Sequence, residues 1–206
     1  MLSRRSCCGM LAVSLIWPTK AFSAAQADMA ALSADTATLA RRVLRDGDAA
    51  GRPLAIVDKR EAQMGVFDAQ GRLAGVSRVL IGRTPGDKSV AGVGERTQAG
   101  RLLPGDATTS AGRFSSQPGR NLQGEAIVWL DYDAALAIHR LRPGPAARDR
   151  ERRLSTHSPH DNRTSAGCVV VPTAFYEAVV EPLLGQRPGL VYIIPEAGLG
   201  RAFWEA

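Results

Sequence analysis

Short apolar runs separated by turn residues dominate this sequence after Pro53 and restrict its fold more than any other feature. Short apolar runs that alternate with turn residues are typical of β-strands. Asp68-Ala69-Gln70-Gly71 joins two of the runs and predicts a hairpin turn in which Gly71 takes a positive φ. We therefore expect a mainly β domain, with strands at Leu54–Val57, Met64–Phe67, Leu73–Ile81, Ala126–Leu130, Leu136–His139 and Leu190–Ile194.

Two segments have helical rather than strand periodicity. The alanine-rich segment 28–48 places Leu32, Leu39, Val43 and Leu44 on one face, which predicts a helix that packs on the domain or serves as a spacer. A second helix is expected after Pro172, because apolar residues recur there at i, i+4 and i+8, namely Phe175, Val179 and Leu183. The intervening residues 82–124 are rich in turn formers and predict functional loops.

The first 27 residues have the pattern of a secretory signal peptide. Arg4 and Arg5 precede an apolar stretch from Cys7 to Trp17, and small residues follow at Ala25-Gln26-Ala27. The start is similar to a twin-arginine signal, although Cys7 and Cys8 replace the expected apolar pair, so the export route stays open. An uncleaved membrane anchor is the alternative, but the apolar stretch is shorter than the roughly 20 residues that a spanning helix needs. We expect an exported protein of the periplasm or cell envelope.

Charge and cysteine content narrow the possible functions. The formal net charge of +6 includes three basic residues of the leader, so the mature chain is too weakly basic to predict nucleic-acid binding. Of the three cysteines, only Cys168 lies outside the leader. An exported protein with one unpaired thiol pairs with another molecule or uses the thiol chemically.

Cys168 is predicted to be a catalytic nucleophile. It follows Ser165-Ala166-Gly167, and the backbone amides of Gly167 and Cys168 are positioned in sequence to stabilise an oxyanion. A thiol needs a base or a nearby positive charge to react near neutral pH. His139 ends an apolar run, so a rigid strand would hold its imidazole, and we favour it as that base.

Other interpretations of these residues stay open at this point. Cys168 is alternatively a buried structural cysteine that packs as a small apolar residue. His139 is alternatively a core or surface histidine that bonds to a backbone carbonyl. His157 and His160 lie in a turn-rich segment typical of a solvated loop. Together with Cys168 and His139 they form an alternative zinc set, without a second cysteine.

The order of these motifs resembles the catalytic domain of L,D-transpeptidases over roughly residues 53–196. The family signature is a histidine followed later by Ser-x-Gly-Cys, matched here by His139 and Ser165-Ala166-Gly167-Cys168. Ala55-Ile56-Val57-Asp58 resembles the opening strand, and Val191-Tyr192-Ile193-Ile194-Pro195 resembles the terminal strand. Residues 108–114 are similar to the family's Thr-Pro-x-Gly loop with serine in place of proline.

The resemblance implies an antiparallel β-sandwich or barrel-like domain at 53–196. With the signal peptide at 1–27, the predicted domain order continues with a helical leader or linker at 28–52, this domain, and a tail at 197–206. The resemblance also implies that Cys168 attacks a meso-diaminopimelyl carbonyl of a peptidoglycan tetrapeptide stem and expels the terminal D-alanine. A second amine then resolves the thioester, with His139 transferring protons. No metal or cofactor is implied, and the partner is peptidoglycan in cell-wall biogenesis and cell shape.

Three positions depart from the family pattern. The interval from His139 to Cys168 is longer than usual, so residues 140–163 are expected to form an enlarged loop. Ala166 stands where many members have histidine, and Val169-Val170-Val171 replaces an arginine. We expect Ser165, Arg163, Asn162 and Arg140 to contact substrate, because arginine binds carboxylates bidentately. The other arginines of this basic loop are further candidates or part of a solvated charged surface: Arg142, Arg148, Arg150, Arg152 and Arg153.

These departures keep several functions open. An altered acyl donor or acceptor, an L,D-carboxypeptidase that uses water, and a non-catalytic peptidoglycan-binding or envelope protein are the alternatives. The glycines near residues 92–100 lack the strand-turn-helix setting of a phosphate-binding loop, so no nucleotide or redox cofactor is predicted. The sequence does not indicate an oligomeric state.

Overall fold

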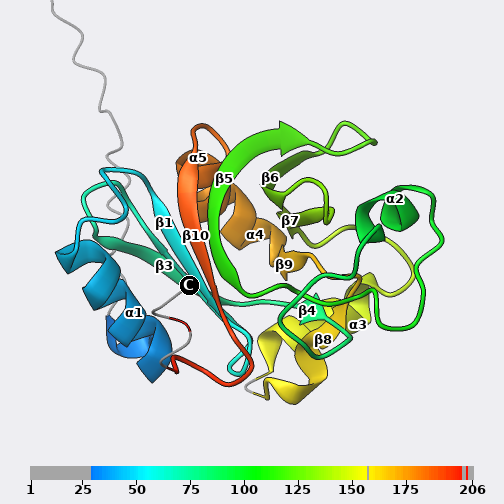
Figure 1. Ribbon diagram of the computed structural model, residues 1–206, viewed down its shortest axis with the longest axis horizontal. Helices are drawn as coiled ribbons and strands as arrows, with labels where there is room; N and C mark the ends of the chain where they lie inside the picture. The colour runs from blue at the N-terminus through cyan, green and yellow to red at the C-terminus, as the bar shows by residue number, and fades with distance from the viewer. Residues whose placement is uncertain (1–28, 157, 201–202, 204–206) are drawn as a thin grey trace, which may run out of the picture.

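A computed structural model describes residues 29–200 and 203, except residue 157. The predicted signal peptide, His157 and most of the extreme C-terminal tail lie outside these residues. Figure 1 shows a strongly bent sheet with helices on both sides. The helical elements are η1 (Met29–Ala31), α1 (Ala34–Arg45), α2 (Val93–Gln98), α3 (Ala147–Ser155), η2 (His160–Asn162), α4 (Thr173–Phe175), η3 (Tyr176–Val180) and α5 (Glu181–Leu184).

Eight strands form one sheet, in agreement with the mainly β expectation. Its order is β3-β2-β1-β10-β5-β6-β7-β9, and β4 and β8 form a separate parallel pair. Most neighbours are antiparallel, whereas β1 with β10 and β7 with β9 are parallel. The strands are β1 (Leu54–Asp58), β2 (Gln63–Phe67), β3 (Leu73–Arg78), β4 (Ile81–Gly82), β5 (Gly112–Arg120), β6 (Ala126–Asp131), β7 (Leu136–Arg140), β8 (Arg163–Ser165), β9 (Val169–Val171) and β10 (Gly189–Ile194).

The sheet is nearly closed into a barrel. Leu80, just after β3, exchanges two backbone hydrogen bonds of 2.8 Å with Val170 of β9. These bonds connect the two ends of the eight-stranded order. The arc of β5 in Figure 1 bridges the two halves of the barrel, and the indole of Trp129 packs on it at Gly119, where a Cβ would lie 2.6 Å from the ring.

Successive residues of a strand point to opposite faces of the sheet, and they contribute to two apolar clusters, one on each face. Ala55 and Val57 of β1 belong to the barrel interior, which also contains Tyr176, Val180 and Leu184 of the η3–α5 segment. Phe175, Val179 and Leu183 pack on this interior cluster, as the i, i+4, i+8 pattern predicted.

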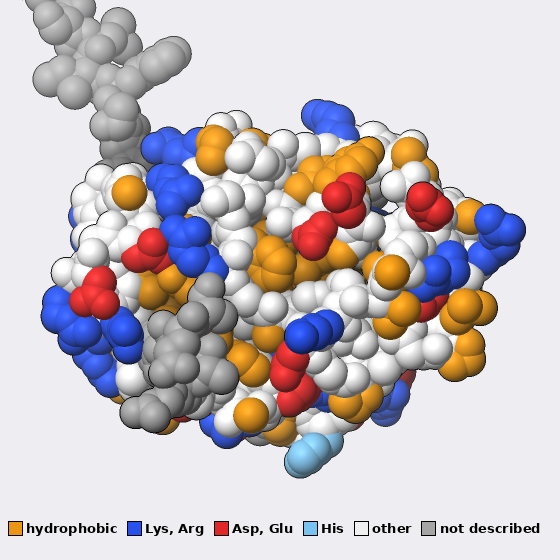
Figure 2. All heavy atoms as spheres, viewed as in Figure 1, with side chains coloured by type: hydrophobic (Ala, Val, Ile, Leu, Met, Phe, Trp, Pro, Cys, Tyr) orange, Lys and Arg blue, Asp and Glu red, His pale blue; other side chains and the backbone are white. Residues whose placement is uncertain are grey.

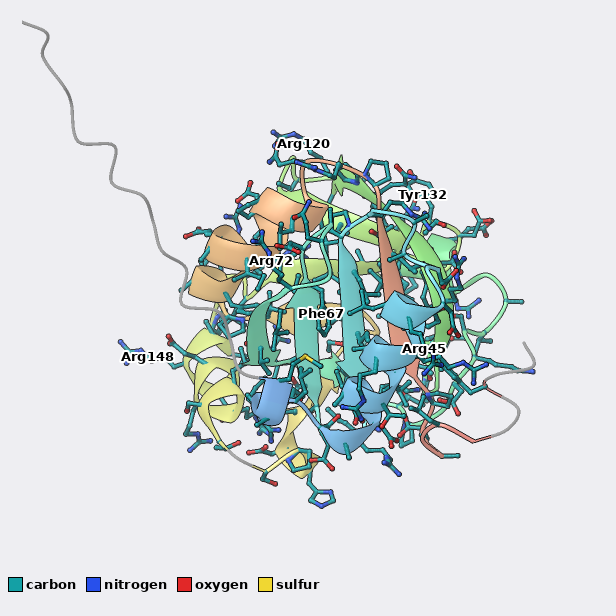
Figure 3. The ribbon with its side chains drawn as sticks, turned by 90° about the vertical axis from the view of Figure 1, so that its left-hand side faces the viewer. Arg45, Phe67, Arg72, Arg120, Tyr132 and Arg148 are labelled. Atoms are coloured by element: carbon teal, nitrogen blue, oxygen red, sulfur yellow. The ribbon has the colours of Figure 1, made fainter. Side chains whose placement is uncertain are left out.

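The other face of the sheet is covered by α1. Leu54 and Ile56 of β1 contact a cluster that includes Leu39 and Val43 of the helix. Figure 3 shows the helix lying across the strands, with Phe67 in the middle of the sheet. The helix α1 of the described residues 29–52 therefore packs on the sheet. Asp48, just beyond the helix, accepts hydrogen bonds from Arg113 at 2.7 and 2.9 Å and from the hydroxyl of Tyr192.

Three segments contain regular structure that the sequence did not predict, and two of them were expected to be loops. Residues 82–124 include α2 and the whole of β5, which alternates polar and small residues and so shows no apolar run. Residues 140–163 were expected to be one enlarged loop, and they contain α3, which is held by ion pairs from Asp149 to Arg152 and Arg153. Val169–Val171, singled out only as a departure from the family motif, is the fully buried β9.

Within the described part of the chain, no helix is both long enough and apolar enough to cross a membrane. On the face in Figure 2, basic and acidic side chains are interspersed and do not form a single basic patch.

Candidate active site

Cys168 ends a tight loop between β8 and β9. The hydroxyl of Ser165 donates to the Cys168 carbonyl at 2.6 Å and accepts the Gly167 N–H at 3.1 Å. Gly167 has a φ of +128°, and a Cβ there would lie 3.1 Å from the Thr108 carbonyl oxygen. The loop therefore needs glycine at position 167, because the backbone has a positive φ there and packs closely on Thr108. It needs serine at position 165, because that hydroxyl makes two hydrogen bonds within the loop.

His139 is brought to this loop by strand pairing. It lies on β7, opposite Val170 of the parallel strand β9, and Cys168 directly precedes β9. Its Nδ1 lies 2.8 Å from the carbonyl oxygen of Arg140. Because a carbonyl oxygen only accepts, we assign the proton to Nδ1, which leaves Nε2 as the proton acceptor.

Cys168 and His139 line the same cavity, which has a volume of about 390 Å³. Ser165 and Ala166 also line it. The Cys168 thiol donates to the Ala135 carbonyl at 3.3 Å, so the sulfur is oriented by backbone in the resting state. Cys168, His139 and Ser165 thus line one cavity, and their roles as nucleophile, base and substrate contact stay predictions.

The electrostatics favour a neutral pair at rest. Burial, reinforced by the positive charge of Arg142, lowers the pKa of His139 to about 4. Burial also raises the pKa of the Cys168 thiol, against a smaller opposing effect of an Ala137 backbone hydrogen bond and Arg142. At neutral pH the cavity therefore holds a thiol and a neutral imidazole, whose unprotonated nitrogen is able to accept a proton.

The cavity wall is positively charged. Arg120, Arg142 and Arg150 line it, and no Asp or Glu belongs to its described lining. Arg142 is backed by Glu125 at 2.6 Å, whereas Arg150 makes no side-chain ion pair or hydrogen bond with any described residue. Such a wall suits a substrate that carries carboxylates.

An aromatic pair also lines the cavity. The rings of Trp129 and Tyr132 have centroids 5.0 Å apart and planes inclined at 59°. In Figure 3, Tyr132 and Arg120 lie at the same end of the molecule. The cavity therefore combines apolar surface with cationic groups, as ligand sites commonly do.

Three predicted substrate contacts lie elsewhere. Arg163 binds Glu196 at 2.6 Å, and Arg140 binds Glu125 at 3.2 Å and Glu177 at 3.3 Å. Asn162 is buried and donates to the Val79 carbonyl at 2.9 Å. None of the three lines the cavity, because each side chain is engaged in these contacts outside the cavity.

The predicted zinc set is not assembled among the described residues. His160 is exposed on η2, and no group of three or more His, Cys, Asp or Glu in the described ranges is arranged to hold a metal ion. His157 lies outside those ranges.

Sequence reasoning missed one contact of the site and the helix that carries another. Arg150, one of the candidates in the basic loop, reaches the wall from α3, which was expected to be loop. Asp149 with Arg152 and Arg153 at helical spacing was the available signal for that helix. Thr109 contacts the nucleophile loop from behind, where its hydroxyl donates to the Gly167 carbonyl at 2.6 Å. Its place in the Thr-rich stretch 108–110 was the signal for that contact.

The chain is similar in fold to solved L,D-transpeptidase structures. One is from Xylanimonas cellulosilytica, with 15% identity and a TM-score of 0.43, covering 69% of this chain and 60% of that one. Another is the catalytic domain of the E. faecium L,D-transpeptidase, with 16% identity and a TM-score of 0.37, covering 70% of this chain and 98% of that one.

A third similar structure is the helical cell shape determining protein Pgp2 from Campylobacter jejuni. It has 14% identity and a TM-score of 0.45, and the match covers 70% of this chain and 48% of that one. The match therefore spans less than two thirds of the Xylanimonas and Campylobacter chains. No protein-family model and no curated protein matches the sequence. At these identities and scores, none of the matches assigns a role to a residue of this chain.

Proposed function

We propose that this chain is an exported cysteine L,D-transpeptidase that acts on peptidoglycan tetrapeptide stems. The observation that carries the proposal is the shared cavity of Cys168 and His139, in which the bond from Nδ1 to the Arg140 carbonyl leaves Nε2 to take the thiol proton. The family resemblance of the motif supplies the substrate. Location in the periplasm or cell envelope rests on the leader at 1–27, which lies outside the described residues.

The proposed reaction has two acyl-transfer steps. Cys168 Sγ attacks the meso-diaminopimelyl carbonyl carbon while its proton passes to His139 Nε2. The tetrahedral intermediate collapses as the imidazolium returns a proton to the D-alanine amine, which leaves, and a thioester remains. A second amine then attacks the thioester, the thiol is regenerated, and an amide forms.

The oxyanion donor is narrowed to one of the two predicted amides. The Gly167 N–H donates to Ser165 Oγ, so it is already engaged. The Cys168 N–H has no acceptor among the described residues. We therefore assign the Cys168 amide as the oxyanion donor.

We further assign recognition of the donor carboxylates to Arg142 and Arg150 in place of Arg163 and Arg140. Both line the cavity, and the position of the family arginine is occupied here by the buried strand Val169–Val171.

Arg150→Gln should raise KM about 10-fold with kcat nearly unchanged, equivalent to about 1.4 kcal/mol of lost binding. Arg148→Gln is the matched control, because Arg148 lies on the same helix and points away from the molecule in Figure 3. Equal effects of the two substitutions would contradict the assignment.

The central experiment incubates the mature protein and its Cys168→Ala variant with purified tetrapeptide-stem muropeptides and identifies products by mass spectrometry. Loss of D-alanine with a new 3-3 cross-link, absent in the variant, is the expected result. Loss of D-alanine without a cross-link would indicate an L,D-carboxypeptidase. No reaction would favour a non-catalytic peptidoglycan-binding protein or an altered substrate.

A further inference from the structure

The hydroxyl of Thr109 lies directly behind the nucleophile loop. It is 2% exposed, donates to the Gly167 carbonyl oxygen at 2.6 Å and accepts the Gly82 N–H at 2.8 Å. Both polar functions of this hydroxyl are thus committed to backbone. Its bond to Gly167 is the one that bears on chemistry.

The Gly167 carbonyl and the Cys168 N–H belong to the same peptide unit. Because that unit is planar and trans, fixing the direction of the carbonyl fixes the N–H in the opposite direction. A hydrogen bond accepted by the carbonyl also polarises the amide and strengthens its N–H as a donor. We infer that Thr109 is a positioning residue that aims the Cys168 amide at the oxyanion, an inference that rests on the proposed thiol chemistry.

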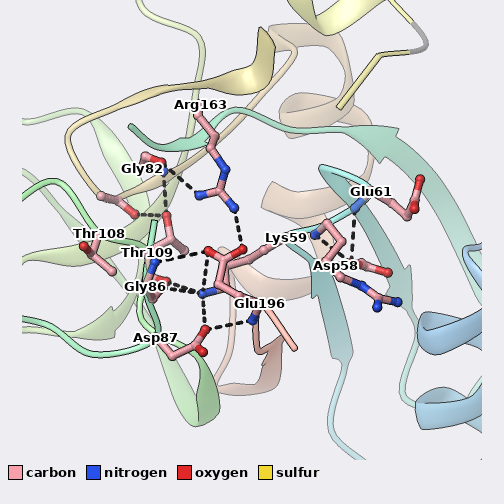
Figure 4. Close-up of polar contacts among 12 residues, drawn as sticks. Asp58, Lys59, Glu61, Gly82, Gly86, Asp87, Thr108, Thr109, Arg163 and Glu196 are labelled. Carbon is pink, nitrogen blue, oxygen red and sulfur yellow. Dashed lines mark hydrogen bonds and ion pairs between the residues drawn. The ribbon is translucent and has the colours of Figure 1, made fainter. Parts of the chain in front are cut away.

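Lys59 holds Thr109 in place. Its side chain is fully buried at the end of β1, and its Nζ donates to the Thr109 carbonyl at 3.0 Å, the Gly86 carbonyl at 2.7 Å and Asp87 at 2.6 Å. Figure 4 shows this ammonium group at the centre of the cluster. A buried ammonium that binds three oxygens is costly to move, so Thr109 is anchored on the side away from Gly167.

Glu196 extends the same anchor to the start of the nucleophile loop. It lies 3.4 Å from Lys59 Nζ and accepts from Arg163 at 2.6 Å. Arg163 begins β8, which pairs with β4 through Ile81 and Gly82 and ends at Ser165. Arg163, predicted to bind substrate, therefore belongs to the support of the loop in this structure.

The test separates reactions that form an oxyanion from those that do not. Cys168 attack on 4-nitrophenyl acetate passes through a tetrahedral oxyanion before 4-nitrophenolate leaves and a thioester remains. Alkylation by iodoacetamide displaces iodide at a saturated carbon and forms no oxyanion. The rates of both reactions are measured for wild type and Thr109→Val, after subtraction of the Cys168→Ala background.

Thr109→Val should slow acylation about 10-fold or more while alkylation changes less than about twofold. Thr109→Ser should restore acylation, because it keeps the hydroxyl. Thr108→Val is the matched control, since the Thr108 hydroxyl contacts only Gly105, at 3.4 Å, among the described residues, and both rates should be unchanged. Thr109→Ala replaces Thr109→Val if circular dichroism shows that the latter does not fold.

Three results would overturn the inference. Equal falls in both rates would show that Thr109 only holds the loop in place, and no change in either would show that it has no role. A wild-type Cys168 that is alkylated but not acylated would mean that no oxyanion is stabilised. Failure of the wild type on muropeptides alone counts against the proposed substrate and leaves this inference standing.

Discussion

The apolar cluster under α1 and the polar cluster behind the Cys168 loop stabilise different parts of the molecule through different interactions. The first joins Leu39 and Val43 of the helix to Leu54, Ile56 and Leu190 of the sheet, all buried. The polar cluster, defined as Lys59, Asp87, Thr109, Arg163 and Glu196, holds loop segments through directed bonds, as Figure 4 shows.

The difference lies in what each cluster demands of its members. Hydrophobic burial is non-directional, so the α1 cluster tolerates exchange among side chains of similar volume. The polar cluster is directional, and each member leaves a buried charge or an unmade hydrogen bond when it is removed. The α1 cluster therefore supports the shape of the fold, and the polar cluster supports the placement of one loop.

The largest expected effect is that of Lys59→Met. It leaves the carbonyl oxygens of Gly86 and Thr109 without their donor, and Asp87 and Glu196 without the ammonium that they share. The free energy of unfolding should fall by about 4 kcal/mol, mostly through the two carbonyls, because a buried acceptor left without a donor costs about 1–3 kcal/mol and the two carboxylates are partly exposed. Denaturant unfolding measures this loss, and the acylation rate of Cys168 should fall with it. Arg148→Met on exposed α3 is the control, and a loss below about 1 kcal/mol for Lys59→Met would show that the cluster is not cooperative.

Leu39→Ala should cost somewhat less, about 3 kcal/mol, because it removes buried methyl groups from the α1 cluster and leaves a cavity. The iodoacetamide reactivity of Cys168 should stay unchanged, since this cluster lies on the other face of the sheet. Leu39→Met is the volume-conserving control and should cost less than about 1.5 kcal/mol. A change in Cys168 reactivity in Leu39→Ala would break the separation between the two clusters.

The effect that is smallest near neutral pH is the protonation of His139, and it grows as the pH falls. His139 has a folded pKa of about 4 against an ordinary value of 6.5, so between these values the unfolded chain binds more protons. The free energy of unfolding should therefore decrease as pH falls from about 6.5 towards 4. His139→Gln should remove that part of the pH dependence, which urea unfolding at several pH values measures. If the free energy of unfolding had the same pH dependence in wild type and His139→Gln, then His139 would have the same pKa in the folded and unfolded states.

Much of the fold was predictable because burial marks the sequence locally. The apolar runs at 54–57, 64–67, 126–130, 136–139 and 190–194 correspond to strands, and the segment after Ser33 forms the expected helix. The strand β5 escaped prediction because it alternates exposed polar residues with small ones and carries Pro118 and Gly119. It is a strand because β10 and β6 lie on either side of it.

The site was partly predictable for a related reason. Cys168 and His139 stand out as a lone thiol and as an imidazole at the end of an apolar run, and the structure brings both to one cavity. Arg163, Asn162 and Arg140 were chosen for chemical type and nearness in sequence, and neither property reports side-chain direction. Arg150 reaches the cavity because α3 forms and packs there.

The sequence by itself determined the strand-rich domain, the presence of a helix before it and the identity of the thiol and imidazole, because apolar periodicity and rare reactive residues are local signals. Only the tertiary structure decided that Thr109 binds Gly167, that Lys59 supports Thr109 and that Arg163 pairs with Glu196. The physical reason is that directed polar contacts depend on distance and angle between segments far apart in the chain, and no local pattern encodes either quantity.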